Sequence, residues 1–195
     1  MRRLLVIDDH EPSRRYLVKI LTEARYEVAG EAASGELAVA MARSAVPDVV
    51  LMAVGLPDMD GIEATRRLMQ WRPTPVVLTT SHYDAATIER AKQAGVMAYL
   101  VKPLRAEEII PAVELAVSRF REFLSLREEN SLLKENLEAR KLIERAKGLL
   151  MAQRKLSEEQ AYSLMKKTSM HSRKPMAEIA QAIILAGGVL GGDKS

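Results

Sequence analysis

The sequence of 195 residues contains no cysteine, and aromatic residues make up only 4% of it. The absence of cysteine excludes disulfides and thiolate chemistry. No uninterrupted apolar run approaches the roughly 18 residues of a membrane span. Only four apolar residues separate Arg3 from Asp8, whereas a secretory signal needs roughly 7–15. We therefore expect a soluble, cytoplasmic protein with no membrane partner.

The charges are divided unevenly along the chain. Residues 1–117 carry 14 Lys and Arg against 16 Asp and Glu, a balance of −2, whereas residues 118–195 carry 15 against 10, a balance of +5. This division favours a regulatory domain followed by a module that meets an anion. Ordinary solvated surface charge explains the same numbers equally well, so charge alone does not decide.

The first half alternates between short β-branched runs and segments of helical period. The runs cover residues 4–8, 27–32, 48–53, 75–80 and 98–102. Helical periodicity separates them, for example at 13–25 and 84–95. This order predicts an α/β fold with a five-stranded parallel sheet covered on both faces. In such folds the ligand site lies beyond the carboxyl ends of the strands.

Polar residues gather at those predicted strand ends. They are Asp8, Asp9, Thr79, Thr80 and Lys102, with Pro103 after the lysine. Two adjacent carboxylates crowd each other unless a cation neutralises them. Carboxylate oxygens, an ammonium group and a hydroxyl together suit magnesium and phosphate.

The stretches "VIDD", "GLPDMDG", "VVLTTS" and "AYLVKPL" resemble a receiver domain of a two-component response regulator over residues 1–118. The resemblance implies a flavodoxin-like (βα)5 fold, a histidine kinase as partner and Mg²⁺ as cofactor. It implies that Asp8, Asp9 and the backbone carbonyl of Gly55 hold the metal. The remaining implied roles are a switch hydroxyl on Thr80, an aromatic partner at Tyr99, a phosphoryl-binding ammonium on Lys102 and a cis peptide at Pro103.

The phosphoacceptor aspartate of that family falls on Ala53. A methyl group can neither attack a phosphoryl donor nor bind a metal, so this chain cannot be phosphorylated at the usual position and its metal site is weakened. Two histories fit: a natural receiver that signals without phosphate, or a variant of a phosphorylatable parent. Because the other pocket residues are kept, the isolated loss favours a variant, either natural or engineered.

Residues 112–147 contain neither proline nor glycine, which predicts a long helix whose part from 119 to 138 is a coiled-coil linker. The apolar seam of this helix follows a heptad and consists of Phe123, Leu126, Asn130, Leu133 and Leu137. A lone Asn at an a position favours a two-stranded register. We expect a weak or activation-dependent parallel homodimer. The alternative is a helix that packs this seam on its own domain.

Residues 139–195 are predicted to form a small unit of three helices. Ser157 and Gln160 form a capping box for the second helix, and Gly187 with Gly188 is expected to end the third. Residues 139–189 hold ten Lys and Arg against four Asp and Glu. The candidate nucleic-acid contacts are Arg140, Lys147, Arg154, Lys155, Lys166, Lys167, Arg173 and Lys174.

The stretches "ERAKGLLM", "LSEEQAY" and "AEIAQAII" resemble the ANTAR domain over about residues 137–186. This resemblance implies a transcription antiterminator that binds stem-loop RNA. A DNA-binding regulator is disfavoured, because the third helix is aliphatic where a recognition helix presents donors to base edges. A protein-interaction module with solvated charge stays open. We do not expect an enzyme, since no nucleophile–base pair or metal-ligand cluster stands outside the altered pocket.

Overall fold

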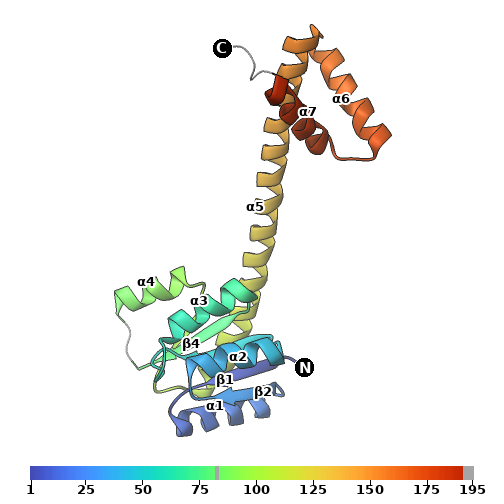
Figure 1. Ribbon diagram of the computed structural model, residues 1–195. Coiled ribbons are helices and arrows are strands. Elements are labelled where there is room, and N and C mark those ends of the chain that lie inside the picture. Colours follow the sequence, from blue (N-terminus) through green and yellow to red (C-terminus); the bar gives the residue numbers. More distant parts are fainter. Residues whose placement is uncertain (82–83, 191–195) are drawn as a thin grey trace. The chain divides into compact units, whose positions relative to one another are not determined.

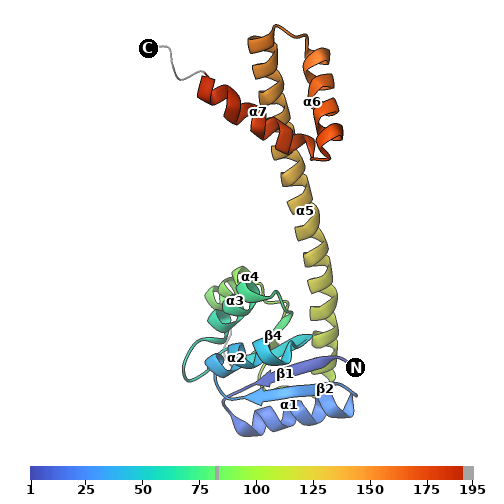
Figure 2. The same ribbon diagram turned by 45° about the vertical axis from the view of Figure 1, so that its right-hand side comes forward.

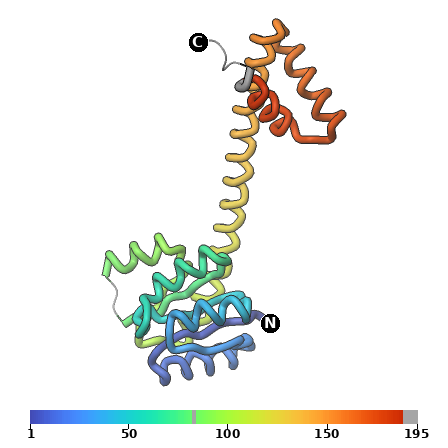
Figure 3. Tube along the Cα trace, viewed as in Figure 1, coloured from blue at the N-terminus to red at the C-terminus, as the bar shows by residue number. Residues whose placement is uncertain are grey.

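The computed structural model describes residues 1–81 and 84–190, and side chains up to residue 187. The chain divides into two compact units. The first is Met1–Leu124, and the second begins at Ser125. One helix, α5 (Ala106–Arg154), contributes to both, as the continuous Cα trace of Figure 3 shows.

The first unit is built on a parallel sheet of five strands in the order β2-β1-β3-β4-β5. The strands are β1 (Arg3–Ile7), β2 (Glu27–Ala32), β3 (Val49–Ala53), β4 (Val76–Thr80) and β5 (Ala98–Val101). The helices that alternate with them are α1 (Glu11–Glu23), α2 (Gly35–Ala45), α3 (Gly61–Trp71), α4 (Ala85–Gln93) and the start of α5. This architecture confirms the predicted flavodoxin-like (βα)5 fold (Figure 1).

The sheet is covered on both faces, with α1 on one side and α2 and α3 on the other (Figures 1 and 2). One core joins alternate residues of β3 and β4, such as Leu51 and Val77, to α1 and α5. The other joins the intervening residues, such as Met52 and Leu78, to α2, α3 and α4. Every residue of β3 and β4 is buried, which explains their continuous apolar runs.

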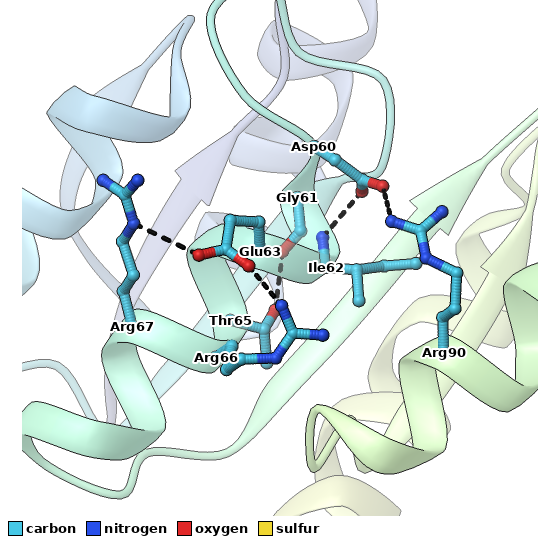
Figure 4. Close-up of polar contacts among 8 residues, drawn as sticks. All are labelled: Asp60, Gly61, Ile62, Glu63, Thr65, Arg66, Arg67 and Arg90. Carbon is cyan, nitrogen blue, oxygen red and sulfur yellow. Dashed lines mark hydrogen bonds and ion pairs between the residues drawn. The ribbon is translucent and has the colours of Figure 1, made fainter.

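The loop after β3 is held close to the start of α3. The Gly61 N–H donates to the carbonyl of Val54 at 2.8 Å. A Cβ at Gly61 would lie 2.1 Å from the carbonyl oxygen of Ala53, so only glycine fits here. Asp60 caps α3 by accepting from the Ile62 N–H at 2.9 Å, as Figure 4 shows. The loop is therefore anchored directly beside the end of β3.

The second unit packs the end of α5 against α6 (Glu158–Ser172) and α7 (Met176–Leu190), as Figure 2 shows. The predicted capping box is present: the Gln160 N–H donates to Ser157 Oγ, and the Ser157 N–H donates to the Gln160 side chain. The buried residues of this core are Ala146, Leu150, Ala161, Met165 and Ala180.

The expected end of the third helix at its glycine pair is wrong. Helix α7 continues through Gly187 and Gly188 to Leu190. Glycine costs about 1 kcal/mol relative to alanine inside a helix, a penalty that neighbouring apolar contacts can override. Likewise α5 extends beyond the predicted residues 112–147 at both ends, and it runs without a break through 119–138.

Candidate functional site

The carboxyl ends of β1 and β5 meet in a buried ion pair. The side chain of Asp8 has no exposed surface, and its Oδ2 accepts from Lys102 Nζ at 2.7 Å. Its Oδ1 accepts from the His10 N–H at 3.0 Å, while Arg14 donates to the Asp8 carbonyl at 2.7 Å. A buried carboxylate needs such partners, because an unpaired buried charge is strongly unfavourable.

The residues implied for magnesium provide only part of a site. Asp9 and Gly55 are exposed at the same edge, but one oxygen of Asp8 already binds the Lys102 ammonium. Among residues 1–81 and 84–190, no group of three or more His, Cys, Asp and Glu side chains is placed to hold a metal. Magnesium takes a near-ideal octahedron of oxygens. Two carboxylates, one of them engaged, fit that requirement poorly.

Ala53 is the last residue of β3 and is 3% exposed. Its Cα is paired with that of Thr79 on β4, and both residues continue the alternation that carries Leu51 and Val77 onto the face of α1 and α5. The side chain at position 53 is therefore an interior methyl group at the tip of a central strand, where the resemblance expects a carboxylate.

Thr80 and Tyr99 lie together at the end of β4 and on β5. The Lys102 N–H donates to the carbonyl of Thr80 at 2.7 Å, which ties the two strand ends together. Burial raises the pKa of the Tyr99 phenol, and the Thr80 side chain partly opposes that rise. The Lys102–Pro103 peptide is cis, as the resemblance implies. The structure thus brings Asp8 to Lys102 and Thr80 to Tyr99, two separate pairs of the residues expected from sequence.

Two carboxylates of the loop have roles that the sequence did not reveal. The backbone N–H groups of Glu36 and Gly35 each donate to the Asp58 carboxylate at 2.8 Å and hold the pKa of Asp58 below its usual range. Asp60 caps α3 and pairs with Arg90 (Figure 4). Their oxygens are engaged at helix starts, so neither substitutes for a carboxylate at position 53. An Asp just before a helix is a sequence signal for the capping role of Asp60, but no such signal exists for the contact of Asp58 with α2.

The candidate cations of the second unit differ in exposure. Seven are exposed, namely Arg140, Arg154, Lys155, Lys166, Lys167, Arg173 and Lys174. The side chain of Lys147 is only 12% exposed, and its Nζ pairs with Glu144 at 2.6 Å and Glu158 at 2.8 Å. These carboxylates raise the pKa of Lys147. The expected RNA contact of Lys147 stays a prediction, while in this structure its ammonium joins α5 to Glu158 of α6.

The expected seam of α5 is exposed on the single chain. Leu126, Leu133 and Leu137 are 66%, 62% and 54% exposed. Phe123 is 39% exposed, and its ring lies 6.1 Å from that of Phe120 between centroids. A row of leucines so exposed at heptad spacing leaves apolar surface available for a partner.

Comparison with known proteins defines the class. Residues 4–114 match the response regulator receiver domain, and residues 132–184 match the ANTAR domain. The chain therefore belongs to the response regulators of two-component systems, with a receiver domain and an ANTAR domain. Both domains are regulatory.

Relatives resemble the chain over different lengths. Over 183 residues it is 42% identical to the transcriptional regulatory protein PdtaR of Mycobacterium tuberculosis, covering 94% of this chain and 89% of that protein. It is 34% identical over 113 residues to the chemotaxis protein CheY of Thermotoga maritima, 57% of this chain and 94% of that one. The receiver domain of NarL from M. tuberculosis superposes with a TM-score of 0.58 at 31% identity, covering 60% of this chain and 96% of that one. Within the described residues no helix has the length and apolarity to cross a membrane.

Proposed function

We propose that this chain is a regulator of transcription that binds stem-loop RNA through residues 139–195. Residues 1–118 are its receiver, and residues 119–138 link the two as a coiled coil. The observation that carries the proposal is the combination of a receiver pocket with an exposed set of cations on an ANTAR unit. The similarity to PdtaR, named as a transcriptional regulator, supports the same assignment.

In this proposal the receiver is unresponsive to phosphoryl donors. The methyl group of Ala53 has no lone pair to form an acyl phosphate. A parent with aspartate at this position would take its phosphoryl group from a histidine kinase and would bind Mg²⁺ with Asp8, Asp9 and the carbonyl of Gly55. In this chain the Lys102–Asp8 ion pair supplies the neutralising charge that a metal would otherwise bring. The protein acts in the cytoplasm as a regulator and not as an enzyme.

The proposed RNA surface surrounds α6. Lys155 stands two residues before the N-cap Ser157 of α6, and Arg173 is the C-cap of that helix; both have a left-handed φ, of 53° and 55°. Arg154 precedes the first, and Lys166 and Lys167 lie on the helix itself. Cations spread in this way suit a phosphate backbone, where each contact releases a condensed counterion.

The third helix supports RNA over duplex DNA as the ligand. Ile179 and Ala180 of α7 are buried, and Ile183 packs against the same core. Helix α7 therefore uses its apolar face inside the unit, and it carries no cation beyond residue 174. A recognition helix for the major groove presents hydrogen-bond donors to base edges. Stem-loop RNA instead offers unstacked loop bases and a phosphate backbone.

The seam on α5 supports a parallel homodimer as the binding form. In the heptad that places Asn130 at an a position, Glu122 and Glu129 are g residues, whereas Arg127 and Lys134 are e residues. In a parallel pair each g residue faces the e residue five positions later on the second copy, so opposite charges meet. An antiparallel pair would bring like charges together. Because the seam is short, association is weak without activation.

The test is binding of a folded stem-loop RNA beside duplex DNA of equal length, with the full chain and with the Ala53→Asp protein. We expect RNA to bind more tightly than DNA, with a steep salt dependence. The affinity for RNA should increase when the Ala53→Asp protein is treated with acetyl phosphate. Arg154→Gln should lower the log–log salt slope by about one unit. Arg43→Gln on α2 is the matched control and should leave the slope unchanged. Equal affinity for RNA and DNA would overturn the assignment.

A further inference from the structure

One buried hydroxyl beside the altered position has no hydrogen-bond partner. Thr79 is fully buried, and within the described residues its Oγ1 contacts no donor or acceptor. Buried polar groups are nearly always hydrogen-bonded, and leaving one unpaired is unfavourable. Two other buried threonines follow that rule: Thr65 donates to the Gly61 carbonyl at 2.8 Å, and Thr74 donates to the Arg72 carbonyl at 3.0 Å. Within the described residues the buried hydroxyls of Thr79 and Tyr99 are the exceptions, and Thr79 is the one paired with Ala53.

The residue opposite Thr79 is Ala53. The two are paired across β3 and β4, and neighbouring strands of a sheet lie about 4.8 Å apart. Both side chains point to the face that α1 and α5 cover. At that separation a carboxylate on the β3 residue reaches a hydroxyl on the β4 residue, whereas a methyl group offers it nothing. On its other side Thr79 is paired with Leu100 of β5, and the leucine side chain has no hydrogen-bond acceptor.

We propose that Thr79 is a positioning residue for the carboxylate that belongs at position 53, to which its hydroxyl donates a hydrogen bond. Alanine at position 53 leaves this donor without a partner. The inference deepens the proposed function, since it adds a residue to the same pocket. It also implies that the interior of this receiver is still built for aspartate, as expected for an isolated replacement.

The role predicts that one substitution has opposite effects in two backgrounds. Thr79→Val keeps the shape and removes the hydroxyl. In the chain as it stands this removes an unpaired group, so the folding equilibrium constant should rise roughly tenfold. In the Ala53→Asp protein it removes the partner of a carboxylate, so the constant should fall roughly tenfold. The coupling between the two positions would then be on the order of 100-fold.

The experiment is urea unfolding of the four full-length proteins, with and without Mg²⁺. The fluorescence of Trp71, the single tryptophan, reports on the receiver unit. Thr65→Val, which removes a satisfied hydroxyl (Figure 4), is the control and should destabilise both backgrounds equally. Thr79→Ser should restore the behaviour of threonine in the Ala53→Asp protein. A Thr79→Val effect of the same sign and size in both backgrounds would overturn the inference.

A second measurement separates this inference from the proposed function. In the Ala53→Asp protein, Thr79→Val should slow phosphorylation by acetyl phosphate, and Thr79→Ser should recover the rate. If the Ala53→Asp protein does not react at all while the unfolding coupling persists, the phosphorylatable parent is wrong and the Thr79 contact stands. If it reacts normally with no coupling to Thr79, the proposed parent stands and the Thr79 contact is wrong.

Discussion

The receiver unit and the C-terminal helical unit keep their charges in different places. The receiver holds one ion pair largely inside, between the buried Asp8 and Lys102 at the strand ends. The helical unit exposes nearly all of its candidate cations and encloses an almost wholly apolar core. A buried pair is sensitive to single substitutions, because removing one partner strands the other. Exposed cations act additively through the phosphate backbone and are screened by salt.

The two units also differ in the size of their cores. The receiver encloses two apolar clusters, one on each face of its sheet. The helical unit encloses one, with five buried residues on three helices. A small core contributes less to stability, because fewer apolar side chains leave water. We therefore expect damage in the helical unit to be less well tolerated than damage in the receiver.

The largest expected effect is the presence or absence of phosphorylation. Acetyl phosphate with Mg²⁺ should leave the intact mass of this chain unchanged, because the methyl group of Ala53 cannot form an acyl phosphate. The Ala53→Asp protein should gain one phosphoryl group, and Ala53→Asn should gain none. A phosphoryl group on Asp58 or Asp60 of the unaltered chain would contradict this expectation, because both carboxylates are engaged at helix starts.

The next effect compares the cores directly. Met165→Ala and Leu78→Ala each remove a fully buried side chain and should cost roughly 2–5 kcal/mol. Met165→Ala should unfold the helical unit while the receiver stays folded. Leu78→Ala should leave both units folded. Hydrogen exchange read by mass spectrometry would resolve α6 and α7 from the sheet. Equal protection of α6 in the two variants would show that the small core is not the weaker one.

A smaller effect tests the orientation of the proposed dimer. Glu129→Lys should weaken self-association several-fold, because it places like charges opposite Lys134 of the second copy. Combining it with Lys134→Glu should restore association, which sedimentation equilibrium would measure. Leu133→Glu is the control that should abolish association altogether. Failure of the paired exchange to restore the dimer would argue for an antiparallel or intramolecular arrangement.

The smallest effect concerns pH and the receiver loop. Hydrogen bonds from the Glu36 and Gly35 amides lower the pKa of Asp58 in the folded state. A depressed pKa contributes stability that is present above the unfolded value of about 4 and is lost as the pH falls through the folded value. Asp58→Asn should therefore destabilise the receiver at pH 7 and progressively less below pH 4.

The control for this pH effect is an uncharged cap on the same helix. Ser34 accepts from the Leu37 N–H at the start of α2. Ser34→Ala should destabilise by an amount that does not change between pH 7 and pH 3, because serine does not titrate there. Unfolding midpoints in urea at several pH values would compare the two. A pH-independent effect of Asp58→Asn would mean that its carboxylate does not hold α2.

Local pattern was enough to predict the receiver fold and much of its pocket. Alternating apolar runs and helical periods determine which segments form strands, and the parallel arrangement then brings their carboxyl ends together. Asp8, Thr80 and Lys102 could be placed at one edge for this reason, whereas Tyr99 came from the resemblance to receiver domains. The capping box at Ser157 was equally visible, since it depends on residues three positions apart. The alanine at position 53 is visible in the sequence itself, and its reading as a lost phosphoacceptor belongs to the proposed function.

Contacts between elements were decided only by the tertiary structure. Heptad spacing put Lys147 on a basic face, but only the packing of α6 against α5 shows that its ammonium pairs with Glu158. Asp58 reaches the start of α2 across 22 residues of chain, a pairing that no period encodes. That the hydroxyl of Thr79 lacks a hydrogen-bond partner became apparent only from the structure, in which the register of β3 and β4 pairs Thr79 with Ala53. A sequence pattern specifies which face a side chain occupies, whereas its partner depends on distances of a few ångströms between packed elements.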